Sequence, residues 1–140
     1  MLINTRDFGK IEVQDKAIFH FTQPIFGFEE YTEYAVLQDE EIGDNIIWLQ
    51  STQNPGLCFI LMDPSGLSNI FNPVLPAGSE KLLGDGDCFC WVIAVITENI
   101  KGSTVNLKCP VFMNTETRLA AQIMLDDDYS VRHPLVKGGA

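Results

Sequence analysis

Apolar and more polar residues alternate along residues 104–113, close to the period of two that places one set of strand side chains on a core face. Pro110 donates no amide hydrogen, so a sheet edge or a bulge is expected there. The pattern breaks at 113–116, resumes at 120–125 and ends at three consecutive aspartates. It predicts two strands and an exit through 129–135. The apolar set of the first strand is Val105, Leu107, Cys109, Val111 and Met113.

Short apolar segments separated by turn residues continue this pattern through the rest of the chain. Residues 88–97 are apolar without alternation and rich in β-branched residues, which predicts a strand covered on both faces. One helical turn is expected at 79–84, with Ser79 as N-cap and Gly84 as C-cap. The other expected elements are a hairpin at 3–13, strands at 17–21, 31–38, 45–51 and 57–62, a surface excursion at 66–77 and a turn at 99–103.

These elements predict an all-β fold, a small antiparallel β-barrel or β-sandwich of about eight or nine short strands with at most one short helical turn. The 140 residues fit a single domain, 1–140. A domain of this size buries roughly two thirds of the surface that its unfolded chain exposes.

Negative charge is concentrated in one part of the chain. The net charge is −10, and residues 17–80 contain nine Asp or Glu and no Lys or Arg, whereas the remainder carries ten acidic and nine basic residues. This argues against nucleic acid as a direct partner, because phosphate binding needs clustered basic side chains. It predicts a negatively charged flank, built by the first half of the chain, that meets a basic protein. The alternative is that the acidic residues only keep a small domain soluble.

The sequence shows no sign of membrane insertion or export. Its longest strongly apolar run, 88–97, has ten residues, whereas a membrane span needs ~20. The N-terminus lacks the basic and apolar regions of a signal peptide, so we expect a cytoplasmic protein. In that reducing compartment free thiols are the expected state of the four cysteines, Cys58, Cys88, Cys90 and Cys109, since no second ligand pair completes a zinc site.

Catalytic motifs are missing from the sequence. The two histidines, His20 and His133, are far apart and lack the patterns that surround metal-binding or nucleophilic residues. The acidic turns at 85–87 and 126–128 lack the spacing of a calcium loop. We therefore expect neither an enzyme nor a bound cofactor or metal. His20 is expected to be a satisfied strand histidine, and His133 to lie exposed near a strand end.

One loop, Pro-Ile-Phe-Gly-Phe at 24–28, carries unusual apolar weight. One interpretation is a plug that closes one end of the barrel. The other is an exposed apolar patch whose acidic rim is Glu29, Glu30 and Glu33, which is typical of a protein-docking site.

Five motifs, in order along the chain, resemble the FliW family of bacterial flagellar assembly factors. The most specific is the C-terminal run N-L-x-x-P-V-x-x-N at 106–114, Q-I-x-L at 122–125 and Y-S-V-R-H-P-L at 129–135. The others are I-x-T-x-x-F-G-x-I-E-V at 3–13, F-x-x-x-x-x-G-F-E at 21–29, W-L-Q-S at 48–51 and F-x-x-x-x-P at 59–64. Pro24 and Phe26 stand where the family usually has Gly and Pro, and residues 65–87 match poorly.

The resemblance implies a non-enzymatic, mostly β protein that binds flagellin and the RNA-binding translational repressor CsrA in turn. Unexported flagellin occupies such a protein and leaves CsrA free to repress flagellin translation. Export of flagellin releases the protein, which then captures CsrA and antagonises it allosterically. We expect residues 27–44 and the exit at 129–133 to contribute to docking. The candidate residues are Gly27, Phe28, Glu29, Glu30, Glu33, Tyr129, Arg132 and His133.

A β-barrel that binds an apolar small molecule is the alternative function. Its signature would be a cavity lined by large aromatic side chains. In a barrel this small such side chains more often fill the interior than line a hollow one. The five candidates are Phe19, Phe21, Trp48, Phe59 and Trp91.

Overall fold

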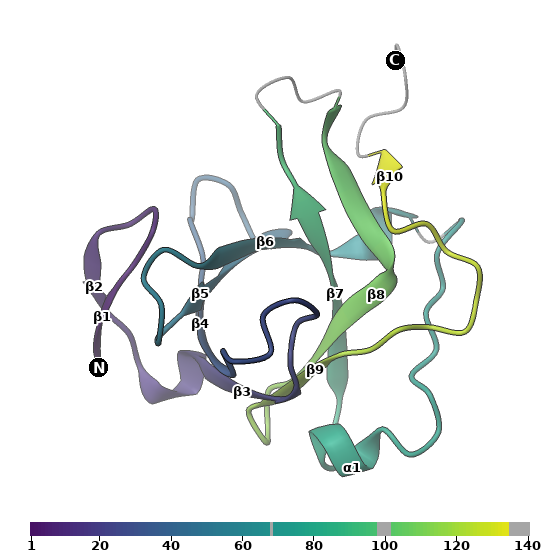
Figure 1. Cartoon of the computed structure of the whole chain (residues 1–140), viewed down its shortest axis with the longest axis horizontal. Helices are drawn as coiled ribbons and strands as arrows, with labels where there is room; N and C mark the ends of the chain where they lie inside the picture. Colours follow the sequence, from purple (N-terminus) through teal and green to yellow (C-terminus); the bar gives the residue numbers. More distant parts are fainter. Residues whose placement is uncertain (68, 98–101, 135–140) are drawn as a thin grey trace.

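The computed structural model of the chain describes residues 1–67, 69–97 and 102–134, so most of the predicted turn at 99–103 and Leu135 lie outside the described residues. The described part is mostly β, as predicted (Figure 1). Its strands are β1 (Leu2–Asn4), β2 (Lys10–Glu12), β3 (Ile18–Gln23), β4 (Glu33–Leu37), β5 (Ile46–Ser51), β6 (Cys58–Met62), β7 (Cys88–Val95), β8 (Thr104–Asn114), β9 (Leu119–Gln122) and β10 (His133–Pro134).

Seven strands, β3 to β9, close into a barrel (Figure 1). Consecutive strands pair antiparallel, and a parallel pairing of β3 with β9 closes the ring, with His20 opposite Leu119 and Phe21 opposite Ala120. This β3–β9 pair is the seam of the barrel. It must be parallel because, when seven strands alternate in direction, the first and the last run the same way. The structure thus confirms the barrel rather than the sandwich and adds one parallel seam.

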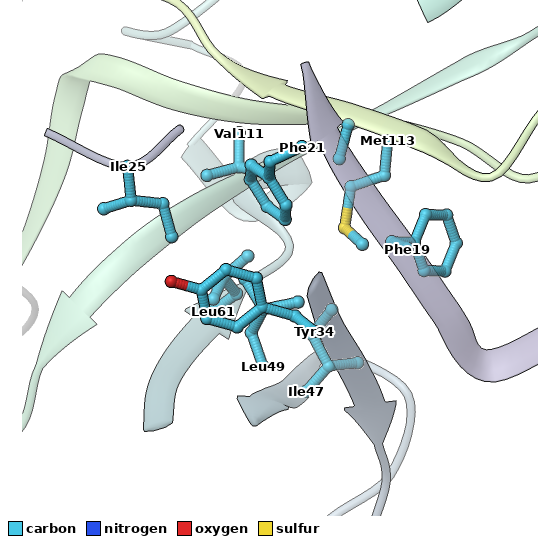
Figure 2. Packing of buried hydrophobic residues seen from close by; sticks show 10 residues of the cluster. Phe19, Phe21, Ile25, Tyr34, Ile47, Leu49, Leu61, Val111 and Met113 are labelled. Atoms are coloured by element: carbon cyan, nitrogen blue, oxygen red, sulfur yellow. The ribbon is translucent and has the colours of Figure 1, made fainter. Parts of the chain in front are cut away.

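Side chains alternate between the inside and the outside of this barrel, as the period of two predicts. On β8, Val111 and Met113 belong to the interior cluster, whereas Phe112 between them belongs to an outer one. Apolar side chains from several strands pack together in the interior (Figure 2). It consists of Phe19, Phe21, Ile25, Tyr34, Ile47, Leu49, Leu61, Val111, Met113 and Ala120.

Two further apolar clusters cover the outside of the barrel. The predicted hairpin is confirmed as β1 and β2, and beside it Phe8 meets Trp48 of β5 edge to face, with ring centroids 5.2 Å apart. Elsewhere, the long connection between β6 and β7 runs beside the barrel wall (Figure 1). Its Phe71 and Leu83 pack in one cluster with residues of β7, β8 and β9. Many outward-facing apolar residues of the strands are therefore buried beneath the β1–β2 hairpin and the β6–β7 connection.

The prediction that β7 is covered on both faces is wrong. Val92 and Ala94 are buried, but Phe89 and Val95 are 53% and 59% exposed. β6 pairs with β7 only from Val92 to Ala94, so the start of β7, residues 88–91, runs past the end of β6 at Met62, and Val95 lies beyond the last pair of the ladder. The continuous apolar run here belongs to a strand whose start extends beyond the neighbouring strand β6.

The expected irregularity at Pro110 is confirmed. Trp91 of β7 lies opposite Val111 of β8, but Ile93, two residues on, lies opposite Asn106, so residues 107–110 bulge out of the ladder. The carbonyl of Pro110 accepts a hydrogen bond from the Ile123 amide at 3.0 Å. β8 thus changes partners at this bulge: its end lines the barrel, and its start pairs with β10.

A short helix, α1 (Glu80–Leu83), underlies the parallel seam. Ser79 stands at the N-cap position as predicted, but its side chain makes no capping hydrogen bond, because its backbone is already helical and its hydroxyl donates to the Pro76 carbonyl. The terminal carbonyls of α1 need partners, and the barrel supplies them: Thr22 donates to Leu82 O at 2.7 Å and Thr117 to Leu83 O at 2.7 Å. Gly84 ends the helix at φ 76°, as predicted.

Three buried side-chain amides tie loops to the barrel wall. Gln50 accepts from the Arg6 amide at 2.9 Å and donates to carbonyls of the β5–β6 turn. Asn114 donates to Leu83 O at 3.0 Å and Asp85 O at 3.1 Å. Gln122, which is 3% exposed, fixes the loop described below. A buried amide is tolerated because its donors and acceptor are satisfied.

We predict that Asn114→Ala lowers the free energy of unfolding by about 3 kcal/mol, since it leaves buried backbone groups without partners. Besides its two donated bonds, Asn114 accepts from the amides of Glu116 and Thr117. Urea unfolding would measure the loss, with the exposed Asn45→Ala as the matched control. Equal stability of the two variants would show that the Asn114 bonds contribute little.

Tyr34 gives a second stability prediction. Its side chain is 0% exposed, its hydroxyl has no hydrogen-bond partner among the described residues, and burial raises its pKa to about 12. An unfolded Tyr ionises near 10, so wild-type stability should fall by about 1.4 kcal/mol per pH unit above 10 through this group. Tyr34→Phe should be at least as stable at pH 7 and should lose less stability between pH 10 and 12, as measured by urea unfolding at both ends.

Candidate protein-docking site

The connection between β3 and β4 lies across one end of the barrel (Figure 1). Ile25, only 2% exposed, points into the interior beneath it, near the hydroxyl of Tyr34 (Figure 2). Phe28 packs edge to face on Phe59 of β6, with ring centroids 5.2 Å apart. Gly27 adopts φ 89°, a conformation that favours glycine, and this lets the chain turn between the two aromatic residues.

A buried glutamine anchors this loop. The Phe26 amide donates to Gln122 Oε1 at 2.7 Å, while Gln122 Nε2 donates to the Cys109 carbonyl at 3.1 Å. Phe26 and Phe28 nevertheless remain 44% and 37% exposed. Both interpretations of the loop therefore hold for different residues: Ile25 is the plug, and Phe26 and Phe28 form an exposed apolar patch on a fixed backbone.

The acidic residues beside the patch are not equivalent. Glu29 and Glu30 are exposed on the loop. Glu33, on β4, accepts a hydrogen bond from the Thr52 hydroxyl at 2.7 Å and lies 3.7 Å from His20 Nδ1. Glu33 thus has a structural role on the barrel wall, which leaves Glu29 and Glu30 as the freely available charges.

The C-terminal candidate residues also differ in role: some are held by structural contacts and one is freely exposed. Tyr129 packs against Phe71 with ring centroids 4.7 Å apart, and its hydroxyl accepts from the Asn72 amide, so it stabilises the long connection. His133 is held in β10 opposite Val105. Arg132 is exposed and lines a cavity together with Val131 and residues of β7 and β8.

Ile93 lies between the two groups of candidates. It packs against the interior cluster that Ile25 closes, and it also lines the cavity beside Arg132. Val95 and Val131, which line that same cavity, are 59% and 54% exposed. The apolar surface near the loop therefore has a counterpart at the end of β7, where Val95 and Val131 are exposed beside Arg132.

The prediction of a single acidic flank is wrong. Glu29 and Glu30 lie on the β3–β4 connection, whereas the acidic residues at 39–44 lie on the β4–β5 connection. Successive connections of an antiparallel barrel emerge at opposite ends, so the segment that is continuous in sequence is divided in space. Lys16 and Arg118 lie at the second end, where they line a cavity with Gln38.

The cysteines are free thiols. Burial raises the pKa of Cys58 to about 11 and that of Cys90 to about 12, and it also raises the pKa of Cys88 and Cys109. All four are therefore protonated and poorly reactive at neutral pH. Within residues 1–67, 69–97 and 102–134, the side chains of His, Cys, Asp and Glu form no group that could hold a metal ion. No helix there is long and apolar enough to cross a membrane.

Known proteins share both the sequence pattern and this barrel. The family model described as "FliW protein" matches residues 2–135. The chain belongs to the FliW family. Flagellar assembly factor FliW of Caldanaerobacter subterraneus subsp. tengcongensis is 33% identical, over 98% of this chain and 94% of that protein. The protein of the same name from Ruminiclostridium cellulolyticum is 33% identical, over 95% of this chain and 93% of its own.

A crystal structure of the flagellar assembly factor FliW matches the fold with a TM-score of 0.88 and 29% identity, covering 100% of both chains. The motifs that carry the FliW resemblance include the three buried amides: Gln50 in W-L-Q-S, Asn114 at the end of the proline motif and Gln122 in Q-I-x-L. The buried roles of these three residues were not predicted. The available signal for Gln122 was a polar residue between two apolar ones in a predicted strand, whereas Gln50 and Asn114 each precede another polar residue.

We predict that Gln122→Ala loosens the docking loop, because the Phe26 amide loses its buried acceptor and the Cys109 carbonyl its donor. Hydrogen exchange at the Phe26 amide should accelerate by about tenfold or more, with a loss of about 1–3 kcal/mol in global stability. Gln53, whose Oε1 accepts from the Thr32 amide at an exposed site, provides the control Gln53→Ala. Unchanged exchange at Phe26 would contradict the anchoring role.

Proposed function

We propose that this protein is a non-enzymatic flagellar assembly factor that binds flagellin and, once released, binds and allosterically antagonises CsrA. Membership of the FliW family supports the assembly role. The partners follow from the resemblance. In this proposal the protein works in the cytoplasm, where unexported flagellin keeps it from CsrA, and export of flagellin frees it to capture CsrA and relieve the repression of flagellin translation.

The observation that supports docking most directly is the fixed loop with outward-facing Phe26 and Phe28 beside Glu29 and Glu30. Apolar side chains on a rigid backbone lose little conformational entropy when a partner covers them. Adjacent charges that carry no structural bonds steer a basic partner without weakening the fold. The surface around Arg132, Val131 and Val95 extends the available apolar area.

Catalysis is not part of the proposal. His20 faces Glu33 on the outer wall, and His133 lies in β10, so the two titratable rings belong to separate sites. The hydrogen bond to Asp7 raises the pKa of Arg6, whereas burial raises the pKa of the cysteine thiols and of Tyr34 and keeps these groups neutral. Such shifts reflect packing in a filled barrel rather than a catalytic cleft.

The charge contribution can be tested by reversing Glu29 and Glu30 to Lys together. Association with purified CsrA should slow by about tenfold at low ionic strength and by much less at high salt, since steering between exposed charges is screened. Glu33 is left unchanged because Thr52 depends on it. Stopped-flow or surface-binding kinetics would measure the rates.

The matched control reverses Glu40 and Glu41, which are exposed on the β4–β5 connection and change the net charge by the same amount. If both double variants slow CsrA equally, total charge rather than the docking loop is responsible. If neither does, the electrostatic part of the proposal is wrong. Flagellin binding is measured on the same variants, so that loss of one partner is distinguished from loss of both.

A further inference from the structure

The two ends of the barrel are built differently. Ile25 closes the end beneath the β3–β4 loop. At the other end a cavity of about 310 Å³ opens between β3, β4, β5, β7 and β8. This volume is at the lower end of the range of small-molecule pockets and suits one ring or a short alkyl chain with a polar head.

The floor of this cavity is the barrel core itself. Phe19, Ile47 and Met113, each 5% exposed or less, belong to the interior cluster and also line the cavity. Trp91 and the half-exposed Phe89 extend the apolar wall along β7. A ligand that enters would therefore remove apolar surface from water on several sides at once.

Two cations stand at its rim, and no carboxylate lines it. Lys16 comes from the turn before β3, and Arg118 from the turn between β8 and β9. The Arg118 guanidinium lies 5.6 Å from the centroid of the Phe19 ring. Within the described residues, neither cation has a carboxylate within 4.0 Å, although the protein carries a net charge of −10.

The backbone holds Arg118 in an unusual conformation. Its φ is 63°, a left-handed value that it alone adopts among the described non-glycine residues, and its amide donates to the Asn114 carbonyl at 2.9 Å. Such a conformation is costly for a residue with a Cβ and persists where the surroundings enforce it. Here the enforced turn places a cation over an apolar opening.

We propose that this cavity binds a small monocarboxylate with an apolar body, a short alkyl or aryl acid. The carboxylate would lie between Lys16 and Arg118, with Gln38 and Thr115 as further polar neighbours, and the body would rest on Phe19, Ile47 and Met113. Charge complementarity selects an anion, and the apolar floor selects against a small inorganic one. The site is separate from the docking loop, which lies at the opposite end.

The cavity at this end of the barrel is not the cavity predicted from the sequence, which five aromatic side chains would have lined. Phe19 and Trp91 do line it. Phe21 and Phe59 instead pack within the filled part of the barrel, and Trp48 lies on the outer wall against Phe8. The proposed small-molecule site therefore lies at the mouth of the barrel rather than in its centre.

Octanoate is a suitable probe, with octanol as its neutral counterpart and octylammonium as its cationic one. Methyl NMR during titration should move the signals of Ile47 and Met113 and leave Ile3, buried in the outer cluster over β4, unchanged. Octanoate should bind about tenfold more tightly than octanol, and octylammonium more weakly than both. Equal binding of all three would overturn the proposal, as would the absence of any shift.

The double variant Lys16→Gln, Arg118→Gln should lose that tenfold preference for octanoate and keep octanol affinity. Lys10→Gln with Lys81→Gln removes the same charge from exposed positions elsewhere and should keep the preference. If loss of Arg118 unfolds the protein, Lys16→Gln alone tests the rim, since Lys16 is exposed and forms no ion pair in the described structure. An unchanged preference in the rim variants would overturn the assignment.

A competition experiment tests whether the carboxylate belongs to a free small molecule or to a side chain of a partner protein. Purified flagellin or CsrA is added to the protein saturated with octanoate, and the Met113 methyl signal is followed. Retention of the octanoate-bound signal supports a free small molecule. Displacement by either protein would overturn the small-molecule assignment, because the cavity would then belong to a protein interface. Neither result bears on docking at the β3–β4 loop, so failure here and failure of the proposed function are distinguishable.

Discussion

Closure of the ring through β9 is the constraint on which the rest of the structure depends. β9 has only four residues, yet it pairs with β8 on one side and with β3 on the other. The bulge at Pro110 bends β8 so that its last residues can reach β9 while its first residues leave the barrel and pair with β10. Without that bend the apolar interior would open along one wall, because seven short strands enclose a core only as a closed ring.

The seam also explains the position of α1. Its carbonyls would be unsatisfied at the end of so short a helix, and they are bonded by Thr22, Thr117 and Asn114 from strands or turns at the seam. The divergent segment before β7 is therefore coupled to the closure of the barrel through its end. It covers the outer wall with Phe71 and Leu83, although its own sequence has no strand periodicity.

The docking loop and the cavity described above lie at opposite ends of the barrel. One end is closed from within by Ile25 and presents Phe26 and Phe28 on a loop fixed by Gln122. The other end is open, with Lys16 and Arg118 lining its cavity and the acidic connection at 39–44 at the same end. This polarity arises from antiparallel order, which sends the Glu29–Glu30 loop and the connection at 39–44 to opposite ends. Two surfaces of different chemistry can therefore act independently.

The sequence by itself determined the all-β class, the bulge at Pro110, the first hairpin and the apolar loop, because strand period, missing amide hydrogens and turn residues are local properties. The FliW motifs indicated the family for the same reason. Only the tertiary structure decided that Gln50, Asn114 and Gln122 are buried anchors, that β7 outreaches its neighbour, and that the acidic segment divides between two ends. Those features depend on which strands become neighbours and where each strand stops, and the pairing of β3 with β9 across about a hundred residues leaves no trace in any local pattern.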